Sequence, residues 1–250
     1  MDLRRPCGLM REKRGTTVTE GTESKRKTRR VVEVVGPAGA GKTTLCQALT
    51  RASGCLHPGS FPDVRRVANA PFFAWYGLRT IPSVLRLCAR GGRQLTRREF
   101  AWLSILNGWP VVLQKEWGTS NEVVVLDQGP VYLLTEIREF GPEYLRGHRA
   151  EKTWQALYGK WARMLDTIVW LNAPDTLLLE RIRTRDKEHI VKSESNQAVF
   201  EFLVCYRNAY DRTISSLSAK NPGLKILRFD TSRKSPEEIS SRLLSEFGLI

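Results

Sequence analysis

The sequence predicts an α/β protein in which helices cover both faces of a doubly wound parallel sheet. Four short, nearly continuous apolar runs alternate with helical patterns, and the first of them passes directly into a glycine-rich turn. Such runs are typical of parallel strands that are buried on both faces. At 250 residues the chain is long enough for one large core, so we expect a single domain over residues 31–250. The expected strands are Val31–Val35, Glu122–Leu126, Thr167–Leu171 and Leu224–Phe229.

The glycine-rich turn reads GPAGAGKT from Gly36 to Thr43. This spacing is the P-loop, or Walker A, pattern, and an expected helix over Thr43–Arg51 supplies the context that the pattern requires. Backbone N–H groups and the positive end of the helix dipole would face a polyphosphate. Lys42 is expected to reach the β- and γ-phosphates, and Thr43 to bind Mg²⁺. The predicted nucleotide contacts are Gly36, Pro37, Ala38, Gly39, Ala40, Gly41, Lys42, Thr43 and Thr44.

Four more helices are expected from the pattern of apolar residues. The clearest start is at Pro236, which falls at an N1 position behind Ser235 and precedes two glutamates of the first turn. The expected spans are Glu143–Leu165, Asp175–Arg183, Gln197–Ser218 and Pro236–Phe247.

Residues 61–121 interrupt this rhythm and are expected to form a helical insertion on the substrate side. They hold nine Lys or Arg against three Asp or Glu, together with many aromatic residues. This mixture suits a base-stacking pocket, a nucleic-acid surface, a membrane-interface face or ordinary core packing, and the sequence leaves these alternatives open. The arginines of the insertion that are candidates to hold an anionic group are Arg65, Arg66, Arg79 and Arg86.

Asp127 ends the run VVVLD, at the edge of a parallel sheet where ligands bind. A carboxylate there can complete a Mg²⁺ site with Thr43, or it can accept a proton from an attacking hydroxyl. Asp127 is therefore predicted as a metal ligand and as a catalytic residue. The structural alternative is an N-cap for the following helix.

A cluster of cations, in the string ERIRTRDK, stands at the end of the helix expected over Asp175–Arg183. Arg181 and Arg185 share a helix face, and positioned cations stabilise a phosphoryl group in transfer. We therefore predict Arg181 and Arg185 as catalytic residues alongside Lys42, and residues 183–196 as a lid over the nucleotide. The alternative is a solvated helix end whose charges compensate the helix dipole.

The formal net charge is +14, and residues 1–30 carry ten Lys or Arg against four Asp or Glu. We expect this segment to be a disordered basic tail. The positive excess favours anionic ligands, with nucleotides, nucleic acid and acidic membrane surfaces as candidates. Five widely spaced cysteines without a CxxC motif favour a reducing cytoplasm, and no apolar run is long enough to predict a transmembrane segment.

The order of these motifs resembles the thymidylate kinase and deoxynucleoside kinase group of P-loop kinases over residues 31–250. The strings VVVLDQGP, TIVWLNAPDTLLLERIRTRD and ILRFDTSRKSPEEI carry the resemblance, together with the aromatic-rich stretch Phe200–Tyr210. It implies a kinase that uses ATP and Mg²⁺ to phosphorylate a small acceptor, most simply a nucleotide or nucleoside. It also implies that Lys42, Thr43, Asp127, Arg181 and Arg185 serve the donor, and that the loop Asp230–Arg233 borders the adenine.

Two departures from that family concern the acceptor. Gln128 stands where the family usually has an arginine, and the acidic-Pro motif near the second strand is replaced by the string His57-Pro58-Gly59. His57 is a candidate for a missing base. A sugar or lipid-linked acceptor is therefore the alternative within the kinase class.

A P-loop ATPase or NTP-binding module that acts on a macromolecular partner, nucleic acid included, is the alternative outside that class. The sequence disfavours it, because there is no NKxD-like guanine motif and no second acid directly after Asp127. A homodimer stays open.

Overall fold

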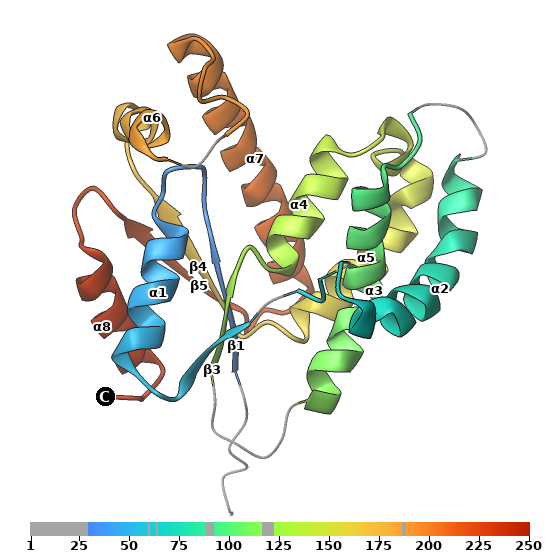
Figure 1. The fold of residues 1–250 in the computed structure, drawn as a ribbon, viewed down its shortest axis with the longest axis horizontal. Helices are drawn as coiled ribbons and strands as arrows, with labels where there is room; N and C mark the ends of the chain where they lie inside the picture. Colours follow the sequence, from blue (N-terminus) through green and yellow to red (C-terminus); the bar gives the residue numbers. More distant parts are fainter. Residues whose placement is uncertain (1–29, 60, 64, 89–92, 117–122, 187–188) are drawn as a thin grey trace, which may run out of the picture.

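The computed structural model describes residues 30–59, 61–63, 65–88, 93–116, 123–186 and 189–250. Five strands form one sheet in the order β2-β3-β1-β4-β5, and each neighbouring pair is parallel (Figure 1). The predicted parallel sheet is therefore confirmed. The strands are β1 (Arg30–Val35), β2 (Leu56–Gly59), β3 (Val123–Asp127), β4 (Thr167–Asn172) and β5 (Lys225–Asp230).

Helices cover both faces of the sheet, as the doubly wound fold requires. One core lies under α1, α6 and α8, a second lies under α3, α4 and α5, and the long helix α7 contributes to both (Figure 1). The α-helices are α1 (Lys42–Ala52), α2 (Ala70–Cys88), α3 (Arg97–Glu116), α4 (Pro130–Phe140), α5 (Glu151–Ala162), α6 (Asp175–Thr184), α7 (Asn196–Lys220) and α8 (Pro236–Glu246). The 3-10 helices are η1 (Val67–Asn69), η2 (Glu143–Leu145) and η3 (His148–Ala150).

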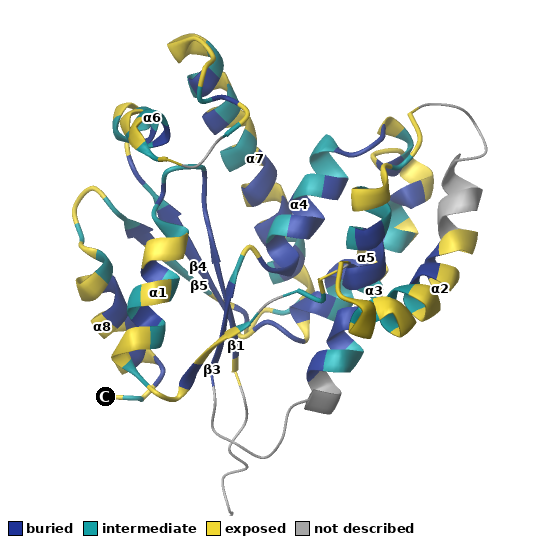
Figure 2. Cartoon of the chain, in the orientation of Figure 1, coloured by how far each residue is buried: buried dark blue, intermediate teal, exposed yellow. Residues whose placement is uncertain are grey.

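The central strand β1 feeds both cores, because successive side chains point to opposite faces of the sheet. Val32 and Val34 belong to the core under α1 and α8, whereas Val31 and Val35 belong to the core under α3, α4 and α5. All four side chains are buried (Figure 2). By the same alternation Glu33 lies on the face of Val31 and Val35, and it is also completely buried.

The structure differs from the sequence prediction at four places described here. Arg30, assigned to the tail, is the first residue of β1, and the rest of the predicted tail lies outside the described residues. β2 was not predicted, because LHPG lacks a β-rich pattern; its place at the sheet edge tolerates Pro58. α4 was not among the expected helices. The helix expected over Glu143–Leu165 is interrupted at Gly147, whose backbone is extended with a ψ of 157°, so the α-helix α5 begins only at Glu151.

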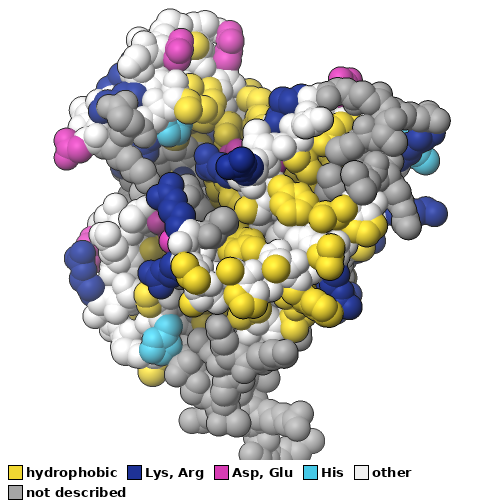
Figure 3. Space-filling view, turned by 45° about the vertical axis from the view of Figure 1, so that its right-hand side comes forward, with side chains coloured by type: hydrophobic (Ala, Val, Ile, Leu, Met, Phe, Trp, Pro, Cys, Tyr) yellow, Lys and Arg dark blue, Asp and Glu magenta, His cyan; other side chains and the backbone are white. Residues whose placement is uncertain are grey.

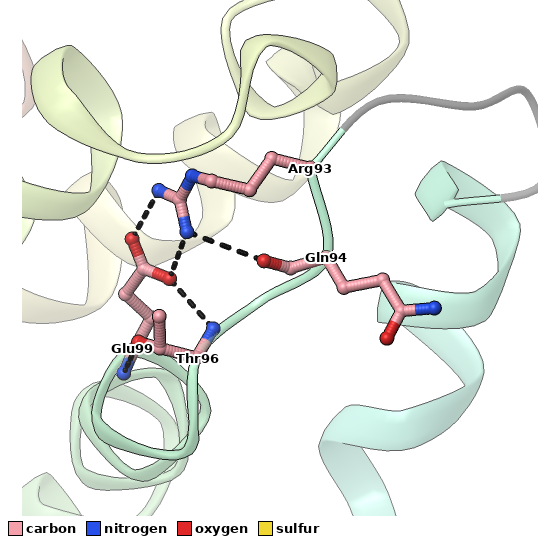
Figure 4. Close-up of polar contacts among 4 residues, drawn as sticks. All are labelled: Arg93, Gln94, Thr96 and Glu99. Atoms are coloured by element: carbon pink, nitrogen blue, oxygen red, sulfur yellow. Dashed lines mark hydrogen bonds and ion pairs between the residues drawn. The ribbon is translucent and has the colours of Figure 1, made fainter.

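The segment predicted as a helical insertion contributes η1, α2 and α3. The start of α3 is fixed by a capping box in which the Thr96 N–H donates to Glu99 Oε2 at 2.8 Å and the Glu99 N–H donates to Thr96 Oγ1 at 3.2 Å (Figure 4). The Arg93 guanidinium donates to both Glu99 carboxylate oxygens, at 2.8 and 2.6 Å. This pairing lowers the pKa of Glu99 to about 2. None of the helices in the described residues is both long and apolar enough to span a bilayer.

Candidate active site

The P-loop runs from the end of β1 to the start of α1 and has the conformation that its glycines predict. Gly36, Gly39 and Gly41 have φ values of 151°, 80° and 85°, which side chains with a Cβ rarely adopt. At Gly36 a Cβ would also lie 2.2 Å from the Leu171 carbonyl oxygen, so the loop can approach β4 only without one. The Lys42 ammonium donates to the carbonyl oxygens of Gly36 and Pro37, both at 2.9 Å. The lysine is thus held inside the curl of the loop.

The two residues predicted to bind Mg²⁺ lie side by side. Thr43 Oγ1 donates to Asp127 Oδ2 at 2.7 Å, although the residues are 84 positions apart. The register of the sheet explains the contact, because Asp127 pairs with Val34 at the edge where β1 enters the P-loop. Hydroxyl and carboxylate oxygens are suitable ligands for Mg²⁺. Among the described residues no group of three or more His, Cys, Asp and Glu could hold a metal ion, so phosphate and water would supply the other ligands.

Gln128 occupies a strained position directly after Asp127. Its φ of 63° makes it the one non-glycine residue with a positive φ in the part of the chain that the structure describes. Residues held in this region cost free energy and cluster at functional sites. Gln128 also lines the cavity beside the P-loop. The residue that replaces the arginine of the resembling family therefore lies at the site.

Arg181, on α6, connects the P-loop with the loop after β5. Its Nη1 donates to Thr231 Oγ1 at 2.9 Å and to the Gly39 carbonyl at 3.3 Å, and its Nη2 donates to the Thr231 carbonyl at 3.0 Å. The loop after β5 is itself shaped by Asp230, whose carboxylate accepts from the Ser232 N–H at 2.8 Å and from the Ser232 hydroxyl at 2.6 Å. One guanidinium thus fixes two walls of the same site.

The cations that the sequence groups together in the predicted lid do different things. Arg185 lines the cavity beside Arg181, and its Nε is buried without a hydrogen-bond partner among the described residues. Arg183 instead donates to the carbonyl oxygens of Lys192 and Glu194, so it braces the turn of the predicted lid. Lys187 lies outside the described residues. Only part of the cationic cluster therefore faces the nucleotide side.

These residues surround one cavity of about 480 Å³. The P-loop, α6, the loop after β5 and the start of α8 form its walls. Sequence reasoning missed Lys234, a further cation at the cavity, because it assigned a role only to the preceding loop Asp230–Arg233. The lining residues are Gly39, Gly41, Lys42, Thr43, Thr44, Leu45, Gln128, Leu171, Arg181, Arg185, Thr231, Lys234, Pro236 and Ile239.

A second polar and aromatic group lies where α3, α4 and α7 meet. The Tyr206 hydroxyl donates to Glu136 Oε1 at 2.7 Å, and burial raises the pKa of both side chains. The Arg98 guanidinium lies 4.3 Å from the Trp102 ring centroid, and the Trp102 ring lies 6.0 Å from that of Tyr132. We call these five residues the α3–α4–α7 cluster. The sequence pointed to Trp102 and Tyr206 only as members of aromatic-rich stretches, and it gave no signal for Glu136.

Glu33 anchors the start of α4 from beneath. Its carboxylate accepts from the backbone N–H groups of Val131, at 2.8 Å, and Tyr132, at 3.0 Å. Gly129 makes room for this contact, since a Cβ there would lie 2.6 Å from the Glu33 carboxyl carbon. Burial raises the pKa of Glu33 to about 8, against the lowering effect of the backbone hydrogen bonds. Sequence reasoning missed this role, because Glu33 lies in an otherwise apolar strand.

The other acceptor candidates from the sequence are not among the residues that line the cavity beside the P-loop. His57 is exposed on the edge strand β2. Arg65, Arg66 and Arg79 are also exposed, and the Arg79 guanidinium lies 4.7 Å from the Trp75 ring centroid on α2. The side chain of Arg86 lies outside the described residues.

A phosphate loop between β1 and α1, with Asp127 at the end of the adjacent strand, defines the P-loop class of nucleotide-binding folds. No protein-family model matches the sequence, and no curated protein sequence matches it. Among solved structures, thymidylate kinase from Candida albicans aligns with 88% of this chain and 91% of its own, with a TM-score of 0.50 and 15% sequence identity. The chain therefore has the fold of the P-loop nucleotide kinases.

Two other solved structures are similar over nearly their whole length. The YorR protein from Bacillus subtilis, in complex with phosphorylated GDP, aligns with 88% of this chain and 96% of its own, with a TM-score of 0.46 and 16% identity. Deoxyadenosine kinase from M. mycoides, with bound dCTP, aligns with 88% of this chain and 100% of its own, with a TM-score of 0.45 and 12% identity.

Proposed function

We propose that this chain is an ATP- and Mg²⁺-dependent kinase that transfers the γ-phosphoryl group to a nucleotide or nucleoside. The observation that carries the proposal is the 2.7 Å hydrogen bond from Thr43 Oγ1 to Asp127 Oδ2 beside the P-loop. It joins a hydroxyl and a carboxylate from two separate elements at the point that a bound triphosphate would reach. The fold shared with a thymidylate kinase supports the same assignment.

The donor side suits phosphoryl transfer because it gathers positive charge around one cavity. Lys42, Arg181 and Arg185 would stabilise the negative charge on the terminal phosphate oxygens. Mg²⁺ held by Thr43 and Asp127 would supply further neutralisation of the β- and γ-phosphates. An acceptor oxygen would bond to the γ-phosphorus while the bond to the β–γ bridging oxygen breaks, which releases ADP; a nucleoside hydroxyl would also lose its proton, whereas an ionised nucleotide phosphate has none to lose.

The α3–α4–α7 cluster supports an acceptor with a planar base. The aromatic rings of Trp102 and Tyr132 can stack on a base, and the paired Glu136 and Tyr206 side chains can hydrogen-bond to its edge. Tyr132 lies on the first turn of α4, five residues beyond Asp127, so the cluster and the proposed metal ligand are held by one continuous segment. Arg98 offers a guanidinium for an anionic group of the acceptor.

A transfer screen with γ-labelled ATP tests the proposal. The purified chain would be incubated with Mg²⁺ and separate pools of nucleosides, nucleoside monophosphates and sugars, and labelled products would be separated from inorganic phosphate. We expect a labelled nucleotide product, and we expect chelation of Mg²⁺ to abolish it. Release of labelled phosphate without any phosphorylated acceptor would instead assign an ATPase, and a labelled sugar would assign the alternative acceptor.

Three variants separate loss of chemistry from loss of folding. Lys42→Ala and Asp127→Asn should remove transfer while the thermal midpoint stays close to that of the wild type. Asp211→Asn is the matched control, because it makes the same carboxylate-to-amide change at an exposed residue of α7. Asp211 forms an exposed ion pair with Arg228 of β5. Exposed pairs contribute about 1 kcal/mol or less, so this control should retain full activity.

A further inference from the structure

The outward face of α2 is apolar along its described length. Trp75, Leu78 and Ile81 are 56%, 65% and 38% exposed, and they follow one another at helical spacing (Figure 2). Pro71, Ala74 and Pro82 extend the same face and are also exposed. We call these six residues the α2 stripe. Figure 3 shows hydrophobic side chains gathered on this side of the molecule.

The opposite face of α2 already packs against the rest of the protein, so the α2 stripe is a second apolar face of the same helix. Phe72 and Tyr76 contact each other with ring centroids 4.9 Å apart, and a Cβ at Gly108 of α3 would meet both of them. Thr80 is buried, and its hydroxyl accepts from Asn107 Nδ2 at 3.2 Å. A helix that is apolar on both faces is expected to be covered on both. The α2 stripe therefore calls for a second partner.

The surroundings of the α2 stripe are strongly basic. Residues 64–98 contain eight arginines and neither Asp nor Glu. Arg65 and Arg66 are exposed just before η1, where Val67 is 88% exposed, and the Arg79 guanidinium lies 4.7 Å from the Trp75 ring centroid. Arg93 is not counted among the arginines that could bind a partner, because its guanidinium is paired with the Glu99 carboxylate (Figure 4). The partner must accept an apolar stripe and neutralise arginines at once.

We propose that α2 docks on the surface of an anionic lipid bilayer, with the α2 stripe and Val67 in the headgroup region and Arg65, Arg66 and Arg79 on lipid phosphates. A bilayer meets both requirements, since amphipathic helices bind it through buried apolar area and attraction to anionic lipid. A second copy fits less well, because it would bring the same arginines together without a carboxylate in the segment. A nucleic acid would leave Leu78 and Ile81 uncovered. The proposal is independent of the catalytic assignment.

Vesicle co-sedimentation of the full chain tests the proposal. The wild type is expected to sediment with phosphatidylcholine vesicles that contain phosphatidylserine, and to stay in solution with phosphatidylcholine alone. Leu78→Gln should weaken binding about tenfold, because it withdraws a large apolar side chain from the headgroup region. Arg65→Gln combined with Arg66→Gln should weaken it about fivefold for each arginine. Binding should also fall as salt rises.

Matched controls separate the contribution of α2 to vesicle binding from that of the basic segment 1–29, which all variants share. Val204→Gln changes an exposed apolar residue of α7, and Arg51→Gln with Arg242→Gln removes two exposed arginines on α1 and α8. Both controls should bind as the wild type does. Equal binding by all variants, or no binding to either kind of vesicle, would overturn the proposal. A wild-type dimer in light scattering that Leu78→Gln dissociates would assign the α2 stripe to a second copy instead, and binding to an acidic peptide but not to vesicles would assign it to a protein.

Discussion

Glu33→Gln isolates a buried carboxylate, because Glu33 is the one charged side chain that is fully buried in the described part of the chain. Gln has nearly the same shape, so it fits the space that Gly129 leaves beneath α4. It keeps one acceptor oxygen for the backbone N–H groups of Val131 and Tyr132, whereas the carboxylate accepts from both, at 2.8 and 3.0 Å. Loss of one such hydrogen bond should cost about 1–3 kcal/mol.

The larger effect of this substitution is on pH dependence. Burial raises the pKa of Glu33 from 4.5 to about 8, and the nearby Asp127 carboxylate acts in the same direction. Between these values the folded chain holds a proton that the unfolded chain has released. The contribution to stability is therefore complete below pH 4.5 and is lost as the pH rises through about 8. Each pH unit in this window changes the free energy of unfolding by about 1.4 kcal/mol.

Urea unfolding at pH 5 and pH 8 measures both effects. From pH 5 to pH 8 the free energy of unfolding of Glu33→Gln should rise by roughly 3 kcal/mol relative to that of the wild type, because glutamine has no proton to release. At pH 5 the variant should be the less stable of the two. Glu201→Gln, an exposed change on α7, serves as the control and should follow the wild-type profile. Parallel profiles for Glu33→Gln and the wild type would refute a protonated carboxyl beneath α4.

Three further predictions concern the donor site and the start of α3. Arg181→Met should lower kcat and also raise the KM for ATP, because it removes a cation from the cavity and releases the loop after β5 from the P-loop; an unchanged KM would argue against this bridge. Arg185→Met should lower kcat about 10²-fold or more, as for a cation on the transferring phosphate, and Arg183→Met should act less strongly because it braces the predicted lid. Glu99→Gln should destabilise by about 1 kcal/mol above pH 4.5, because it removes the carboxylate that pairs with Arg93, and the difference should vanish as the pH falls toward 2; an unchanged gap at low pH in thermal melts would contradict this pairing.

The sequence predicted the parts of the fold whose signals are local. The P-loop, Asp127 at the end of β3, and the capped start of α8 behind Ser235 all follow from residues that are neighbours in the chain. The sequence did not predict β2, because Leu56–Gly59 is a strand only through its pairing with β3 at the sheet edge. The helix expected over Glu143–Leu165 forms only from Glu151 to Ala162, because Gly147 has extended backbone.

The sequence could not predict the α3–α4–α7 cluster for the same reason. Glu136 and Tyr206 are 70 residues apart and meet only because α4 and α7 pack together. The strained backbone of Gln128 is likewise a property of the fold, since no residue type by itself requires a φ of 63° at that position.

The class of this protein follows from the amino-acid sequence alone, because a phosphate loop and the alternation of strand and helix depend on the spacing of nearby residues. Packing is what brings Thr43 to Asp127, lets Arg181 but not Arg183 join the P-loop to the loop after β5, and places Glu33 beneath α4. Those contacts join residues that packing brings together from distant segments. It is burial, which no local pattern encodes, that gives the Glu33 carboxyl its raised pKa.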